Sequence, residues 1–237
     1  MVSRRDVLKG LLLSPLLAKN VNADRLEAEA IERILKSLYL VNTHFDYNLG
    51  DEKKEGVYQG VAIAYDNSLL TLSHITKPEE IPIQMGNYHV VRVPINVKGH
   101  QIEGQDLEAI VDAEETDLAV YKLPKGFKGK RYPFGLGDSD EIYYTQPVLI
   151  IGNPGLEGVN VRNGEVSSKV RTVKEIAEDG SESHRTGFYI SQHLYPGDSG
   201  SPLIDRERFG RLLGLNAESH GGRGFVRPIN LFKPYLK

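Results

Sequence analysis

The stretch Gly197-Asp198-Ser199-Gly200-Ser201-Pro202 carries the densest chemical signal in this chain of 237 residues. Two glycines and a proline around a serine predict a tight turn with exposed backbone, which leaves the hydroxyl of Ser199 accessible. In such a turn the N–H groups of Gly197 and Ser199 can point at one spot and bind a developing oxyanion. A serine hydroxyl is a poor nucleophile by itself, so this interpretation requires a base within hydrogen-bond reach and a third group that orients the base.

Two other segments supply candidates for the base and the orienting acid. Of the seven histidines, His74 alone directly follows a strongly apolar strand, while Asp117 heads another, Leu118-Ala119-Val120. A polar group at the end of a buried strand costs free energy unless it has a partner. Nearby carboxylates that compete for the acid role but lack this apolar continuation are Asp112, Glu114 and Glu115.

These segments resemble the catalytic motifs of chymotrypsin-like serine peptidases. In that family the base lies in Leu-Thr-x-x-His, the acid in Asp-Leu-Ala and the nucleophile in Gly-Asp-Ser-Gly, in the chain order His, Asp, Ser. The similarity runs from about residue 60 to residue 236. Gly152-Asn153-Pro154 and residues 224–230 look most like the bacterial high-temperature-requirement branch, whereas Ser201 looks more like the glutamyl-endopeptidase branch.

The resemblance implies a serine endopeptidase that works through a Ser-His-Asp triad and an acyl-enzyme, without a cofactor. It implies roles for Ser199 as nucleophile, His74 as general base and then acid, and Asp117 as the orienting acid. The N–H groups of Gly197 and Ser199 would form the oxyanion hole. An α/β-hydrolase is disfavoured, because its Gly-x-Ser-x-Gly motif would need glycine where Ser201 stands.

The rest of the chain predicts an all-β protein. Hydrophobic residues make up 40% and charged residues 26% of the sequence, close to globular averages. From residue 37 onward, short runs rich in Val, Ile, Tyr and Thr follow a period of two and indicate strands. Residues 61–65 and 69–72 predict a hairpin. A Lys/Gly-rich stretch at 125–133 predicts a linker between two β halves.

For one peptidase domain over residues 41–237, the resemblance implies a double six-stranded β-barrel with the triad in the cleft between the barrels. We expect barrel one at about 41–124 and barrel two at about 134–237, ending in a short C-terminal helix. The 38 residues after Ser199 fall below the ~50-residue floor for another domain, so we expect no appended peptide-binding domain.

The first 23 residues predict an export signal rather than part of the fold. A basic start with Arg4 and Arg5 precedes a nine-residue apolar run, Gly10 to Ala18, which is shorter than the ~20 residues of a membrane-spanning helix. Small residues follow, as in a cleavable leader. The paired arginines resemble a twin-arginine signal. We therefore expect export by that route to the periplasm, the cell envelope or the outside of the cell, with membrane contact only through the leader. The alternatives are an ordinary Sec signal or a buried amphipathic helix. An amphipathic helix is expected at residues 24–40.

Composition restricts cofactors and partners. Lys and Arg number 29 against 32 for Asp and Glu, a net charge of −3, so nucleic acid is not an expected partner. The absence of Cys excludes disulfides, zinc knuckles and iron–sulfur clusters. The histidines show no metal-ligand spacing, so no metal is expected. The expected partner is a peptide or protein substrate.

Substrate preference and activation stay open at this point. The resemblance places His193 at the base of the pocket for the side chain before the cut and Asn216 on its wall. Neutral His193 would favour aromatic or polar side chains, and protonated His193 acidic ones. The glutamyl branch has histidine where Asn216 stands, so its specificity is not transferred.

Asp198 raises a separate question about activation. In secreted trypsin-like enzymes a freed amino terminus neutralises this aspartate, whereas the expected mature end here is Asp24. Either Asp198 has a different partner or it caps its own turn.

A second hypothesis gives the chain the same fold but no catalytic activity. In this interpretation the chain is a catalytically silent module that binds peptides or cell-envelope partners. The intact triad residue types argue against it, since a binder has no need of all three.

Overall fold

The computed structural model describes residues 21–85, 89–152, 158–176 and 182–236. Most of the predicted export signal, residues 1–20, and Asn153-Pro154 lie outside these ranges. The helical elements are α2 Val21–Leu35, α3 Ser73–Thr76, and the 3-10 turns η2 Glu114–Thr116, η4 Ile229–Leu231 and η5 Lys233–Tyr235. The strands are β1 Leu38–Leu49, β2 Glu52–Tyr65, β3 Ser68–Thr71, β4 Glu80–Met85, β5 His89–Ile102, β6 Gln105–Asp106, β7 Glu108–Ala113, β8 Leu118–Lys122, β9 Pro147–Gly152, β10 Asn160–Glu165, β11 Arg171–Ile176, β12 Glu182–Ile190, β13 Pro202–Asp205, β14 Arg211–His220 and β15 Arg223–Pro228.

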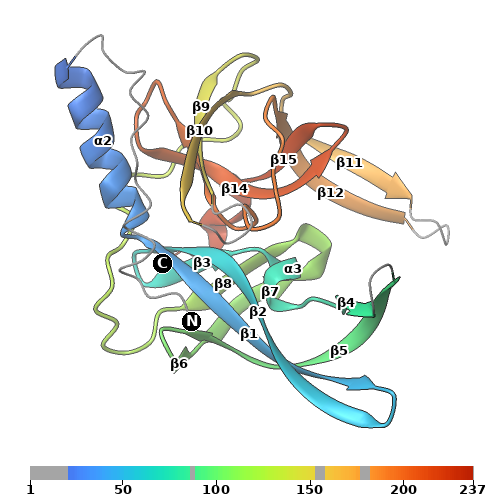
Figure 1. The fold of residues 1–237 in the computed structure, drawn as a ribbon. Coiled ribbons are helices and arrows are strands. Elements are labelled where there is room, and N and C mark those ends of the chain that lie inside the picture. Colours follow the sequence, from blue (N-terminus) through green and yellow to red (C-terminus); the bar gives the residue numbers. More distant parts are fainter. Residues whose placement is uncertain (1–20, 86–88, 153–157, 177–181, 237) are drawn as a thin grey trace.

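The strands form two antiparallel sheets, one from each half of the chain (Figure 1). The first runs β4-β5-β1-β2-β3-β8-β7, with β6 paired to β5, and the second runs β10-β9-β13-β14-β15-β12-β11. The predicted hairpin is confirmed, since Ile63 of β2 pairs with Leu70 of β3. Two all-β halves are therefore present, with eight and seven strands where six each were expected. In the first half, β6 leads into β7 at one end of the path and pairs with β5 near the other end. In the second half, an isolated bridge joins Val166, directly after β10, to Ile190 of β12. The two ends of each sheet therefore approach each other, as the expected barrels require.

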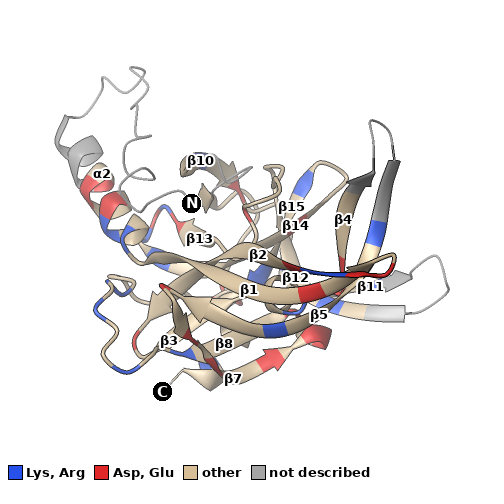
Figure 2. Cartoon of the chain, turned by 60° about the horizontal axis from the view of Figure 1, so that its bottom comes forward, with Lys and Arg blue, Asp and Glu red and all other residues tan. Residues whose placement is uncertain are grey.

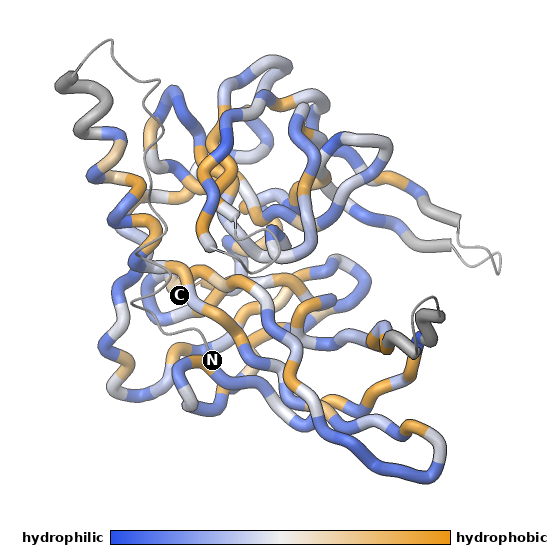
Figure 3. Tube along the Cα trace, in the orientation of Figure 1, coloured by the Kyte–Doolittle hydropathy of each residue, from blue (hydrophilic) through white to orange (hydrophobic). Residues whose placement is uncertain are grey.

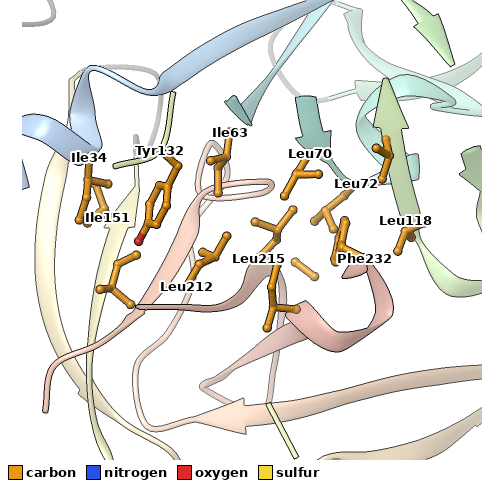
Figure 4. Close-up of a cluster of buried hydrophobic side chains, with 14 of the residues drawn as sticks. Ile34, Ile63, Leu70, Leu72, Leu118, Tyr132, Ile151, Leu212, Leu215 and Phe232 are labelled. Carbon is orange, nitrogen blue, oxygen red and sulfur yellow. The ribbon is translucent and has the colours of Figure 1, made fainter. Parts of the chain in front are cut away.

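A buried apolar cluster joins the two halves and the N-terminal helix (Figure 4). It contains Ile34 of α2, Leu70 and Leu72 from the first half, and Leu212 and Leu215 from β14. Fully burying a Leu or Ile side chain contributes roughly 1.5–3 kcal/mol. Because this cluster takes side chains from both sheets, it sets the position of one half against the other.

The predicted linker is part of this packing. Tyr132 is buried, its N–H donates to the carbonyl of Ala64 at 2.6 Å, and its hydroxyl donates to the carbonyl of Gly210 at 2.7 Å. The ring of Phe127 contacts Tyr39 edge-on, with centroids 5.1 Å apart. The segment therefore ties the first half to the second, although its Lys/Gly content indicates only a spacer.

The helices near the two ends of the chain differ in length from the predicted ones. The helix α2 ends at Leu35, five residues before the expected 40, because Ser37 closes it with N–H and hydroxyl bonds to the carbonyl of Ile34 at 2.8 and 2.6 Å. Strand β1 then begins at once. The expected C-terminal helix consists of the short turns η4 and η5, and Pro234 lacks the N–H that an α-helix interior needs.

The surface carries mixed charge. In Figure 2, basic and acidic residues are interspersed along the strands in view. The tip of the β1–β2 hairpin is hydrophilic in Figure 3, in keeping with Asp51, Glu52, Lys53 and Lys54. Over the described ranges, no helix combines the length and apolar character of a membrane span. Within the same ranges, no cluster of three or more His, Asp or Glu side chains is arranged to hold a metal ion.

Candidate active site

His74 stands on the single helical turn α3, directly after strand β3. Asp112 holds this turn in place by accepting hydrogen bonds from the hydroxyls of Ser73 at 2.6 Å, Thr76 at 2.9 Å and Tyr121 at 2.5 Å. One of the carboxylates that competed for the acid role therefore supports the α3 turn through Ser73 and Thr76, which flank His74 on that turn.

Asp117 lies beside the imidazole of His74. Its Oδ1 accepts from the backbone N–H of His74 at 3.0 Å and lies 2.9 Å from Nδ1 of the ring. A carboxylate acceptor at Nδ1 keeps the proton on that nitrogen and leaves Nε2 as a free acceptor. Asp117 has a positive φ of 53°, which aspartate tolerates better than most residues, at the point where η2 turns into β8.

Arg227 is the residue of this site that sequence reasoning missed. It is fully buried on β15 in the second half, and its Nε donates to Oδ2 of Asp117 at 3.1 Å. One Nη donates to the carbonyl of Thr186 at 3.3 Å, and the other lies 3.8 Å from Glu218. A charged residue between Val226 and Pro228 in an apolar strand was the available signal, because a buried arginine needs a charged partner.

Burial and the charges around Asp117 act on its pKa in opposite directions. Burial by itself raises the pKa of the Asp117 carboxyl, but the hydrogen bonds and charge of His74, with the charge of Arg227, hold it below the ordinary value. The Asp117 carboxyl therefore stays ionised to lower pH than an ordinary aspartate.

Replacing Arg227 with methionine is expected to destabilise the protein by about 3–5 kcal/mol near pH 7, because a buried carboxylate loses its cation. This loss should shrink on acidification, since a carboxyl with a lowered folded pKa contributes stability above its unfolded pKa and loses it as pH falls through the folded pKa. Without the guanidinium the pKa of Asp117 rises, so the variant loses less than wild type over that acidic window.

Urea unfolding at a series of pH values below neutrality measures this difference. Far-UV circular dichroism is the suitable signal because the chain has no Trp. Arg208→Met, which removes an exposed partner of Glu141, is the matched control and should have little effect at any pH. A cost of Arg227→Met that stays constant with pH would point to packing instead of charge.

Ser199 lies on a turn of the second half that packs against the first half. Gly197 and Gly200 have φ of +96° and +80°, which glycine adopts at no steric cost. A Cβ on Gly200 would lie 2.0 Å from the carbonyl oxygen of Val61 and 2.9 Å from Cδ1 of Ile75. The turn therefore abuts the residue next to His74, and only glycine permits that approach.

The hydroxyl of Ser199 donates to the carbonyl of Ala217 at 2.8 Å. Ala217 lies at a register shift between β14 and β15, a bulge of the kind common beside active sites. Among the contacts of the described residues, no hydrogen bond joins Ser199 to His74. The structure thus brings together His74 and Asp117 by hydrogen bonds, and brings the backbone of the Ser199 turn against their neighbour.

The backbone of the turn leaves two donors unused. Asp198, Gly200 and Ser201 donate their N–H groups to the carbonyls of Tyr195, Asn216 and Asp198. The N–H groups of Gly197 and Ser199 have no acceptor among the described residues. These are the two groups predicted for the oxyanion hole.

The two predicted substrate contacts lie in different surroundings. His193 is exposed, and its ring meets that of Tyr195 edge-on with centroids 4.9 Å apart. Asn216 is fully buried, and its amide donates to the hydroxyl of Ser201 at 3.0 Å. In this arrangement Asn216 holds the turn that carries Ser199 through hydrogen bonds with Ser201 and Gly200, and a role in contacting substrate stays a prediction for both residues.

Comparison with known proteins agrees with this architecture. Residues 59–215 match the family described as the trypsin-like peptidase domain. A serine protease HtrA-like protein of Staphylococcus epidermidis is 34% identical over 125 residues, covering 48% of this chain and 21% of that protein. The serine protease PepD of Mycobacterium tuberculosis is 26% identical over 204 residues, covering 84% of this chain and 41% of that protein. A probable periplasmic serine endoprotease DegP-like of Pseudomonas putida is 28% identical over 192 residues, with 77% and 35% covered.

Solved structures show the same fold. The HtrA-type protease AlgW with decapeptide aligns with a TM-score of 0.57 and 22% identity, covering 86% of this chain and 64% of that chain. The serine endoprotease from Yersinia pestis aligns with a TM-score of 0.54 and 20% identity, covering 88% and 64%. The chain spans less than half the length of these curated relatives.

Proposed function

Because this chain belongs to the family of trypsin-like peptidase domains, we propose that it is a serine endopeptidase that cleaves peptide bonds through Ser199, His74 and Asp117. The observation that carries the proposal is the 2.9 Å contact between Nδ1 of His74 and Oδ1 of Asp117, located beside the residue on which the Ser199 turn packs. The curated relatives include several serine proteases, and peptides accompany some of the similar structures.

The proposed reaction begins with rotation of the Ser199 hydroxyl from the carbonyl of Ala217 toward Nε2 of His74. His74 takes the hydroxyl proton as Oγ attacks the peptide carbonyl carbon, and Asp117 stabilises the imidazolium that forms. The N–H groups of Gly197 and Ser199 hold the oxyanion. His74 then protonates the leaving amine, and water, deprotonated by the same imidazole, hydrolyses the acyl-enzyme. The sequence of steps requires neither a metal nor a cofactor.

Labelling with a fluorophosphonate probe tests this proposal. The probe reacts with a serine only where a neighbouring base and an oxyanion site activate it. We expect the folded protein to gain one label on the peptide that contains Ser199, and heat-denatured protein to gain none.

One observation favours a second candidate, a peptide-binding module without catalysis. The hydroxyl of Ser199 donates to the carbonyl of Ala217, and no hydrogen bond joins it to His74 among the described residues. Folded protein that binds peptides, but neither reacts with the fluorophosphonate nor cleaves peptides, would support this candidate and overturn the first.

We also propose that the chain is exported through its first 23 residues by the twin-arginine route. The support is the motif around Arg4 and Arg5 and the relative named as a probable periplasmic endoprotease. Replacing both arginines with lysine should leave the precursor in the cytoplasm of a bacterial host that has a twin-arginine translocase. Lys9→Arg is the matched control, and unaltered export of the double-lysine variant would contradict the route.

A further inference from the structure

Asp198, the residue before the proposed nucleophile, is fully buried with its charge paired by one cation. Its Oδ2 accepts from the backbone N–H of Tyr195 at 2.8 Å and from an Nη of Arg162 at 2.5 Å. Its Oδ1 makes no hydrogen bond with any described residue. An ionised carboxylate in this position depends on the guanidinium, because burying an unpaired charge is costly.

Arg162 contacts the loop before Ser199 at three points. Besides Asp198, it donates to the carbonyl of His193 at 2.9 Å, and its guanidinium carbon lies 5.4 Å from the centroid of the Tyr195 ring. Arg162 belongs to β10, whereas these partners span residues 193–198. One side chain from a paired strand therefore holds both ends of the loop.

The neighbouring strand is shaped to receive the carboxylate. Gly152 of β9 lies so close that a Cβ there would be 1.9 Å from Oδ1 of Asp198. Gly152 pairs with Asn160 and Ile150 pairs with Arg162, so the glycine and the arginine belong to the same two-stranded ladder. The β9–β10 pair thus supplies both the space and the positive charge that Asp198 needs.

We propose that Arg162 is a positioning residue that holds the 193–198 loop in the shape that aims the N–H groups of Gly197 and Ser199 at the oxyanion. This inference rests on the proposed function. The cation comes from within the chain, so the oxyanion site forms on folding and needs no new amino terminus made by proteolysis. The second alternative for Asp198, a purely local cap, is insufficient, because the Tyr195 N–H alone does not neutralise the charge.

Kinetics of wild type, Arg162→Gln, Asp198→Asn and the double variant test the pairing. We expect Arg162→Gln to lower turnover of a chromogenic peptide by about 10²- to 10³-fold, as loss of an oxyanion donor does, with most of the loss in kcat. The double variant should regain about tenfold or more of that loss, because the amide introduced at position 198 carries no charge to be paired. Arg162→Lys keeps the charge and should fall between wild type and Arg162→Gln.

Arg208→Gln is the matched control, since Arg208 pairs with Glu141 on the exposed surface and, among the described residues, has no hydrogen bond or ion pair with this loop. Wild-type kcat in Arg162→Gln, or a double variant no better than the single one, would overturn the proposal. If Arg162→Gln does not fold, the double variant decides, since it lacks the unpaired charge and should be folded and active. A double variant that is folded but inactive would count against the proposal.

Urea midpoints of the same four proteins separate this inference from the proposed function. If wild type shows no turnover, the enzyme proposal fails while the pairing is still measured. Strongly non-additive shifts in the midpoints support coupling between Arg162 and Asp198, and additive shifts refute it.

Discussion

Ser199→Ala is expected to lower kcat for a peptide substrate by about 10⁴- to 10⁶-fold and to abolish labelling by a fluorophosphonate. The variant keeps the turn, because the glycines at 197 and 200 supply its special backbone and the Ser199 hydroxyl makes only one bond among the described residues, to the carbonyl of Ala217. The loss is therefore chemical and not structural. Initial rates with a chromogenic peptide and mass spectrometry of the labelled protein measure it.

Ser201→Ala is the matched control for this experiment. Ser201 lies two residues further along the same turn, is buried, and donates its hydroxyl to the carbonyl of Asp198 at 2.5 Å. Its replacement should lower stability modestly and leave the label in place. Label that persists in Ser199→Ala, or vanishes only in Ser201→Ala, would show that the nucleophile has been misassigned.

Asp117→Asn is expected to lower kcat by about 10⁴-fold. The two carboxylate oxygens accept from His74 on one side and from Arg227 on the other. An amide has one oxygen and one NH2, so either orientation aims the NH2 at a donor. If it faces Arg227, it meets a buried cation that cannot lose its proton. If it faces His74, it forces the ring proton onto Nε2, which can then no longer accept the proton of Ser199.

Asp112→Asn is the matched control for Asp117→Asn. Asp112 accepts from the hydroxyls of Ser73, Thr76 and Tyr121, and a hydroxyl can rotate to accept as well as donate. The three hydroxyls therefore tolerate an amide at 112, and the partly exposed Lys77 ammonium, 3.7 Å from Oδ1, loses only a weak ion pair. We expect kcat to stay within about tenfold of wild type. Steady-state kinetics and urea midpoints of both variants show which of the two carboxylates takes part in catalysis. Equal losses of kcat would mean that Asp117 acts only through stability.

Short-range patterns in the sequence predicted the elements that carry the site. Period-two runs with turn residues between them identified the β2–β3 hairpin and strand β8, because alternation reports directly on a half-buried strand. The positions of His74 and Asp117 at strand ends indicated residues that need partners. The structure places the two side chains against each other.

Contacts between distant segments were not predictable in the same way. Arg227 and Asp117 are 110 positions apart, and Arg162 and Asp198 are 36 apart. A single sequence shows that a buried charge is costly, but its partner depends on the register and packing of two sheets. The bond from Ser199 to Ala217 was also missed, because it depends on a bulge in the β14–β15 ladder and on one side-chain rotation.

The proposed base and acid belong to one half of the molecule and the proposed nucleophile to the other, with Arg227 reaching across between them. The shared apolar cluster is what keeps these groups within reach. A separation of the halves by a few ångströms would leave every strand intact and still abolish the proposed activity. The proposed activity is thus expected to depend on how the two halves dock, and an agent that separates the two sheets should inhibit it without contacting Ser199, His74 or Asp117.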